Sequence, residues 1–174
     1  MHLNFRLKSK GISIFFTFLL FFLWNGELAA ELGTQVRAPD FSLKDLSDKT
    51  FTLKNHRGQI IVIDFWATWC VPCRKTIPEL IEVNNKYKDK GVVVWGITLD
   101  EPDSYPNKYI LDFKKQYNMN YTVLRSDEKV VEDYLGVDDV RVPIMFIIDR
   151  EGKIVERHEG FDAGAAERLL KKHL

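Results

Sequence analysis

The chain has few cysteines and no excess of charge of either sign. Only two of its 174 residues are cysteine, and 25 basic residues balance 25 acidic ones. The balance argues against a nucleic-acid partner, because binding to phosphates needs a basic surface. Two cysteines do not make a four-ligand zinc site, and His2, His56, His158 and His173 show no matching spacing. We therefore expect no metal and no other cofactor.

Long apolar runs are also absent, apart from one near the N-terminus. Residues 12–24 carry no charge, and Arg6, Lys8 and Lys10 precede them. In a helix this run would extend roughly 20 Å, which is short of the ~30 Å hydrocarbon core of a membrane. A basic lead, an apolar core and small residues after it are typical of a secretory signal. We predict that residues 1–30 form a signal peptide or, alternatively, an N-terminal membrane anchor.

The remaining residues, 34–174, have the composition and the pattern of one globular α/β domain. Runs that are apolar at nearly every position predict buried strands, over residues 60–66, 92–99 and 144–148. Apolar residues at helical spacing predict helices, over residues 70–88, 108–117, 130–135 and a last one capped by Asp162. Shorter strands are predicted at 121–124 and 154–158, and alternation at 41–43 and 51–53 predicts a β-hairpin. The expected fold is a mixed central sheet flanked by helices.

The two cysteines stand close together, in Cys70-Val71-Pro72-Cys73, directly after the first buried strand. A crosslink over so short a span stabilises a fold little, because it removes little entropy from the unfolded chain. The pair therefore indicates redox chemistry. Unpaired N–H groups at the start of a helix would lower the pKa of Cys70 and make it an exposed nucleophile. Cys73, one turn deeper, would then be the resolving thiol, and Pro72 falls where the helix needs no donor.

One acidic residue, Asp64, stands inside the first apolar strand. Burial without a partner raises the pKa of a carboxyl group. Such a group near the resolving thiol can take its proton during exchange. The alternative is an aspartate that only forms hydrogen bonds with backbone groups.

The segment Asp64-Phe-Trp-Ala-Thr-Trp-Cys-Val-Pro-Cys73 resembles the active-site segment of the thioredoxin superfamily. The exported branch that includes TlpA, ResA and the cytochrome c maturation thioredoxins is most similar, and residues 38–43 resemble the first hairpin of that branch. The resemblance runs from about residue 34 to the end. It implies a thioredoxin-like fold with an N-terminal β-hairpin and an extra strand–helix insertion before Pro143, and it implies thiol–disulfide exchange.

The resemblance extends to single residues outside the cysteine pair. Val142-Pro143 matches the cis-proline of the family, which uses the backbone of the preceding residue to pair with a bound peptide. Trp69 matches the aromatic residue beside the nucleophile. Together with Pro72, these residues form the expected substrate-binding surface.

Asp64 matches the buried aspartate of cytoplasmic-type thioredoxins, which supports its role as a proton acceptor. ResA-like members carry a glutamate three residues after the second cysteine, where this chain has Thr76. We therefore expect Asp64 to be the only acid near the cysteine pair.

These features predict a periplasmic or otherwise extracytoplasmic thiol–disulfide oxidoreductase, anchored to the inner membrane by residues 12–24 if they are not cleaved. We expect a monomer that reduces disulfides in exported proteins such as apo-cytochrome c and is itself reduced by a membrane thiol donor. One alternative is a disulfide oxidase or isomerase, which uses the same two cysteines. Another is a copper chaperone or a binding module without catalysis, although copper chaperones of this fold use Cys-x-x-x-Cys. A peroxidase is disfavoured, because Ile63 and Ala67 replace the proline and threonine of the peroxiredoxin pattern.

Overall fold

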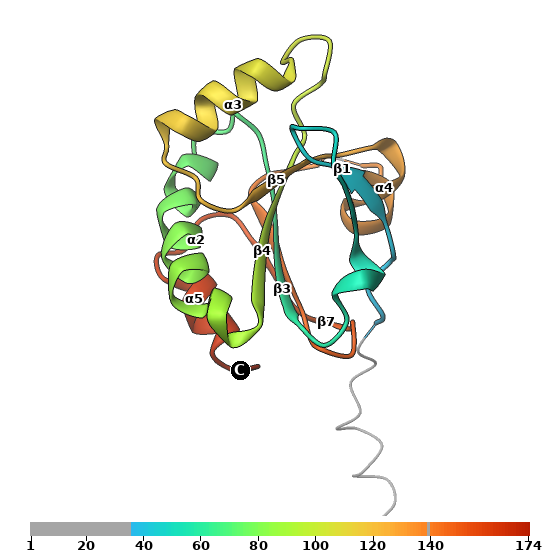
Figure 1. Ribbon diagram of the computed structural model, residues 1–174, viewed down its shortest axis with the longest axis vertical. Helices are drawn as coiled ribbons and strands as arrows, with labels where there is room; N and C mark the ends of the chain where they lie inside the picture. The colour runs from blue at the N-terminus through green and yellow to red at the C-terminus, as the bar shows by residue number, and fades with distance from the viewer. Residues whose placement is uncertain (1–35, 139) are drawn as a thin grey trace, which may run out of the picture. The chain divides into compact units, whose positions relative to one another are not determined.

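The protein, described by a computed structural model over residues 36–138 and 140–174, is built around a five-stranded sheet (Figure 1). The predicted signal peptide or anchor lies outside the described residues. The strand order is β5-β4-β3-β6-β7. The strands are β3 (Ile60–Trp66), β4 (Val92–Thr98), β5 (Thr122–Arg125), β6 (Ile144–Ile148) and β7 (Ile154–Glu159). β3, β4 and β5 are parallel, whereas β6 is antiparallel to both β3 and β7, so the sheet is mixed as predicted.

The two faces of the sheet are covered by different elements (Figure 1). Three helices lie on one face: α2 (Cys73–Tyr87), α3 (Asn107–Gln116) and α5 (Ala165–Leu170). The predicted hairpin and one helix lie on the other: β1 (Ser42–Lys44), β2 (Thr50–Thr52) and α4 (Glu128–Leu135). Two short 3-10 helices, Leu53–His56 and Lys88–Lys90, connect these elements. The segment between β4 and β6 contains the inserted strand and helix that the resemblance implied.

Side chains of the central strand β3 alternate between two apolar cores, one on each face of the sheet. Val62 and Trp66 belong to the core beneath α2, whereas Ile63 and Phe65 belong to the core beneath the hairpin and α4. All residues of β3 are buried, which explains why its sequence is apolar on both faces. By this alternation Asp64 lies on the same face as α2.

Two helices begin later than the sequence pattern predicts. α2 begins at Cys73 and not at residue 70, because the preceding residues form turns in which the Cys70 N–H donates to the Ala67 carbonyl at 3.1 Å. α5 begins at Ala165, and the expected N-cap, Asp162, does not cap it. The Asp162 carboxylate pairs with Arg168 instead.

Candidate active site

The two cysteines form a disulfide at the junction between β3 and α2. Their sulfur atoms are 2.03 Å apart, and their Cα atoms are 5.3 Å apart. The N–H of Cys73, the first residue of α2, donates to the Cys70 sulfur at 3.2 Å. In the reduced protein the same N–H would favour a thiolate at Cys70, because the start of a helix stabilises negative charge. The helix start therefore faces Cys70 as predicted, although the helix begins later in the chain.

Cys70 is the outer residue of the pair, but it is not exposed. Cys70 is 4% exposed and Cys73 is 0% exposed. The expectation of an exposed Cys70 is therefore wrong for this disulfide form. The turns before α2 bring the Cys70 sulfur to 3.5 Å from the carbonyl oxygen of Val142, which covers it.

The residues beside Cys70 in the chain are apolar and exposed. Trp69 is 54% exposed and Val71 is 63% exposed, and Pro72 is exposed as well. Apolar side chains that gather at the surface around a reactive group are typical of a protein-binding surface. Their position is consistent with the substrate-binding surface predicted from the sequence.

The loop that carries Val142 also borders the disulfide, because the Val142 carbonyl oxygen lies 3.5 Å from the Cys70 sulfur. The Val142–Pro143 peptide bond is cis, as the resemblance implied. The Pro143 carbonyl accepts a hydrogen bond of 2.8 Å from the N–H of Gly160. The next residue, Phe161, is 39% exposed. We define the apolar rim as Trp69, Val71 and Phe161 together with the backbone of Val142.

A buried carboxylate that sequence reasoning missed holds the loop before the disulfide. Asp100 follows β4 and is only 2% exposed. It accepts hydrogen bonds from the Thr68 N–H at 2.9 Å, from the Thr68 hydroxyl at 2.7 Å and from the Thr98 hydroxyl at 2.5 Å. Because Thr68 lies just before Trp69 and Cys70, Asp100 fixes the path of the chain into the site. An acidic residue directly after a buried strand was the signal that could have identified it.

Asp64 lies in the middle of β3, on the face of the sheet that α2 covers, and is 1% exposed. Burial raises its pKa from 3.8 to about 8, and a hydrogen bond with the Thr76 hydroxyl lowers it by a smaller amount. A carboxyl group with a pKa near neutrality is able both to take and to give a proton at working pH. Its Oδ2 atom has no hydrogen-bond partner within residues 36–138 and 140–174.

Asp64 lines a cavity of about 20 Å³ that two other acids, Glu79 and Asp162, also line. Neither cysteine lines this cavity, so the expectation that Asp64 is the only acid near the cysteine pair stays a prediction. Glu79 comes from α2, one turn beyond Thr76, and Asp162 comes from the loop before α5. Glu79 is half-buried and Asp162 is exposed, so Asp64 remains the buried member of the three.

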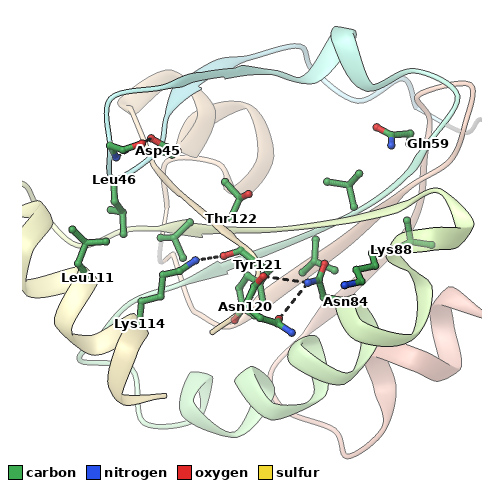
Figure 2. A pocket seen from close by; sticks show the side chains of 15 residues that line it. Asp45, Leu46, Gln59, Asn84, Lys88, Leu111, Lys114, Asn120, Tyr121 and Thr122 are labelled. Atoms are coloured by element: carbon green, nitrogen blue, oxygen red, sulfur yellow. Dashed lines mark hydrogen bonds between the residues drawn. The ribbon is translucent and has the colours of Figure 1, made fainter. Parts of the chain in front are cut away.

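A larger groove of about 510 Å³ lies away from the cysteines (Figure 2). It runs between the turn after β1, the end of α2, and α3. Lys114 donates to the Tyr121 carbonyl in this groove, and Asn84 donates to the Asn120 carbonyl at 3.2 Å. Its lining includes no residue of the cysteine loop, the Val142 loop or the Asp64 cavity, so it is separate from the candidate site.

The family model described as the AhpC/TSA family matches residues 34–157 of this chain. The chain belongs to the AhpC/TSA family. Within this family it is similar to thiol-disulfide oxidoreductase ResA of Bacillus cereus (strain ATCC 10987 / NRS 248), with 33% identity over 87% of this chain and 86% of the relative. It is also similar to thioredoxin-like protein YneN of Bacillus subtilis (strain 168), with 33% identity over 75% of each chain.

Solved structures support the same assignment. A thiol:disulfide interchange protein of the thioredoxin family from Chlorobium tepidum TLS has a TM-score of 0.71 and 25% identity, covering 81% of this chain and 97% of that one. A thiol:disulfide interchange protein from Bacteroides sp. has a TM-score of 0.68 and 25% identity, covering 81% and 90%. The predictions of a thioredoxin-like fold and of a thiol–disulfide oxidoreductase are therefore confirmed for this AhpC/TSA member.

Proposed function

We propose that this protein is an exported reductant of disulfides in client proteins, including apo-cytochrome c. One observation carries the proposal. The Cys70–Cys73 disulfide borders an apolar rim, and the first turn of α2 links it to a buried carboxyl group: the Thr76 hydroxyl donates to the Cys73 carbonyl at 2.9 Å and is also the hydrogen-bond partner of Asp64, whose pKa of about 8 suits proton transfer near neutral pH. The rim would bind an unfolded or extended client, and the Asp64 carboxyl group would exchange a proton with the inner sulfur, that of Cys73.

The first chemical step uses the outer sulfur. In the reduced protein, the Cys70 thiolate attacks one sulfur of a client disulfide, and the other client sulfur leaves as a thiolate. The N–H of Cys73 stabilises the attacking thiolate, because it points at the Cys70 sulfur. The product is a mixed disulfide between Cys70 and the client.

The second step uses the inner sulfur. The Cys73 thiol gives its proton to the Asp64 carboxylate and attacks the Cys70 sulfur, and the second client sulfur leaves as a thiolate. The Cys70–Cys73 disulfide that results is the state seen in the structure. A membrane dithiol then reduces it, and protonated Asp64 returns a proton to the departing Cys73 sulfur.

Client binding is assigned to the apolar rim. Trp69 and Val71 offer exposed apolar surface on one side of Cys70. On the other side the Val142 backbone lies 3.5 Å from the Cys70 sulfur, where a client segment could pair with it as a short added strand. Such pairing would hold a client sulfur in line with Cys70.

The sequence of residues 1–30 supports the proposal that the protein is exported. Residues 34–174 would form the catalytic domain. In the described part of the chain, helices are all too short or too polar to cross a bilayer. Residues 12–24 would either direct secretion and be removed or hold the domain at the outer side of the inner membrane. The domain would then act as a monomer on clients that cross the membrane.

The reduction potential of the Cys70–Cys73 pair tests the direction of the reaction. A potential near ~−250 mV or below supports a reductant, and one near ~−120 mV supports an oxidase and refutes the proposal. Cys70→Ser should abolish reduction of insulin disulfides. Cys73→Ser should instead accumulate mixed disulfides with clients, visible by mass spectrometry as adducts of Cys70. Equal exchange activity in both variants and the wild type would show that the assigned roles are wrong.

A further inference from the structure

Three residues on neighbouring strands form a row across the sheet beneath the disulfide. Asp64 of β3 is in register with Met145 of β6, and Met145 is in register with His158 of β7. Residues in register on adjacent strands point to the same face, so all three side chains point toward α2 and α5. The Asp64 and His158 backbones are two strand spacings apart, about 10 Å.

A cavity lies between the ends of this row. Its volume is about 20 Å³, and Asp64, Met145 and His158 all line it, together with Thr76 and Pro143. This volume is just above the ~10–15 Å³ that one water molecule needs. The cavity is therefore suited to a single water between the two polar side chains.

Two of the residues that line this cavity have a buried side-chain atom without a hydrogen-bond partner among the described residues. These atoms are Oδ2 of Asp64 and Nε2 of His158. Buried polar atoms are almost always hydrogen-bonded to protein or to ordered water. Met145, between them in the row, offers neither atom a strong partner. A bridging water would satisfy both atoms at once.

We propose that one water bridges Asp64 Oδ2 to His158 Nε2 and that His158 is a positioning residue that controls when Asp64 takes and gives its proton. The proposal rests on the proposed function, in which Asp64 serves Cys73. His158 is half-buried: its Nε2 atom is shielded from solvent, whereas another part of its side chain is exposed at the surface of β7.

The proton balance is simple. When Cys73 attacks, its thiol proton moves to the Asp64 carboxylate. Protonated Asp64 passes a proton to the water, the water passes one to Nε2 of the His158 ring, and the ring releases one to solvent. The reverse sequence reloads Asp64 before the disulfide is reduced again. No electron moves along this route, and every proton that enters it leaves it.

Other titratable groups around the cavity do not provide the same route. Tyr121 stays neutral, because burial and the Asp64 charge raise the pKa of its phenol well above 10.0. The nearby carboxyl groups have other partners: Glu79 accepts from the Gly164 N–H at 2.7 Å, Asp162 pairs with Arg168, and Glu156 of β7 pairs with Lys172 and His173. His158 is the one residue lining the cavity in the described chain whose side chain has a basic nitrogen.

Two variants of His158 separate positioning of the water from exchange of the proton. His158→Phe keeps an aromatic ring but removes both nitrogens, and His158→Gln keeps a hydrogen-bonding group that does not titrate. His56→Gln is the matched control, because His56 is also half-buried but lies in the opposite core, 4.8 Å from the Trp95 ring. The measurement is the single-turnover rate of mixed-disulfide resolution between pH 5 and pH 10, in full-length protein.

Loss of the bridge removes a donor that favours the Asp64 carboxylate, so less of the base is ionised at a given pH. We expect His158→Phe to slow resolution about tenfold at pH 7, a shift of about one pH unit, and to recover the wild-type rate in alkali. His158→Gln should show a smaller shift, and His56→Gln should follow the wild type.

The outcomes distinguish this inference from the proposed function. If Asp64→Asn slows resolution and removes its pH dependence while both His158 variants follow the wild type, the bridge is refuted and Asp64 remains the base. If Asp64→Asn resolves mixed disulfides as fast as the wild type at every pH, the role of Asp64 itself is refuted, and the inference with it. Should His158→Phe fail to fold, the His158→Gln profile still decides the question.

Discussion

Replacing Asp64 with asparagine should stabilise the disulfide form of the protein by an amount that grows with pH. The folded-state pKa of Asp64 is about 8, against 3.8 for a solvated aspartate. The folded state therefore binds this proton more tightly than the unfolded state does. The stability that this proton provides is complete below pH 3.8 and is lost as the pH rises through about 8.

The size of the effect follows from the difference of about 4 pKa units. Each unit corresponds to roughly 1.4 kcal/mol, so the wild type should lose about 6 kcal/mol of unfolding free energy between pH 4 and pH 8 through this group. The asparagine variant would have no charge to bury at this position. The difference between Asp64→Asn and the wild type should rise by roughly 1.4 kcal/mol per pH unit over this range and level off above pH 8.

Urea unfolding of the oxidised protein, followed by tryptophan fluorescence from pH 4 to pH 9, measures this difference. Asp112→Asn is the matched control, because it makes the same chemical change at a surface carboxyl paired with Lys108 on α3. It should change the unfolding free energy by less than about 1 kcal/mol at every pH. If the wild type and Asp64→Asn differ by the same amount at all pH values, Asp64 is not buried as a neutral acid, and its proposed role loses its basis.

Three further predictions concern the surroundings of the disulfide. Asp100→Ala should lower the unfolding free energy by about 3 kcal/mol in urea titration, because it leaves the N–H and hydroxyl of Thr68 without their acceptor; a loss below about 1 kcal/mol would contradict the role of Asp100. Gly96→Ala should cost about 1–3 kcal/mol, since a Cβ there would lie 2.9 Å from Trp66 Nε1 and 3.1 Å from Tyr121 Cε2; unchanged urea midpoints would show that the two rings move aside freely. Trp69→Ala should raise KM for protein disulfides and leave reduction of a small disulfide unchanged, and equal losses with both substrates would show that Trp69 acts on Cys70 itself and not through client binding.

The strands of the sheet were predictable because the centre of this sheet is covered on both faces. β3 and β6 have the predicted bounds, since burial on both sides favours apolar residues at nearly every position, Asp64 being the exception. The helix starts were less predictable. Aspartate is a residue type that often caps the N-terminus of a helix, which is why Asp162 was expected to cap α5. In the structure its carboxylate pairs with Arg168 instead, and this contact depends on how the loop before α5 folds.

The site was predictable where it depends on a local motif and not where it depends on distant partners. Cys70, Cys73 and the Val142–Pro143 bond belong to short segments with recognisable patterns. Asp100 holds Thr68 across 32 positions of sequence, and His158 reaches the Asp64 cavity from two strands away. The spacing of residues along the chain gives no sign of such contacts, because they arise only when the sheet brings the strands together.

Because the side chains of β3 alternate between two cores, residues that only stabilise the fold are separated from residues that take part in the sulfur chemistry. Every group assigned to sulfur chemistry lies on the α2 side, whereas Ile61, Ile63 and Phe65 contribute only to the core beneath the hairpin and α4. A mutant library confined to that second core could be selected for heat resistance while the reaction centre keeps its native surroundings. Substitutions in the core beneath the hairpin and α4 should therefore affect the exchange activity much less than substitutions in the core beneath α2.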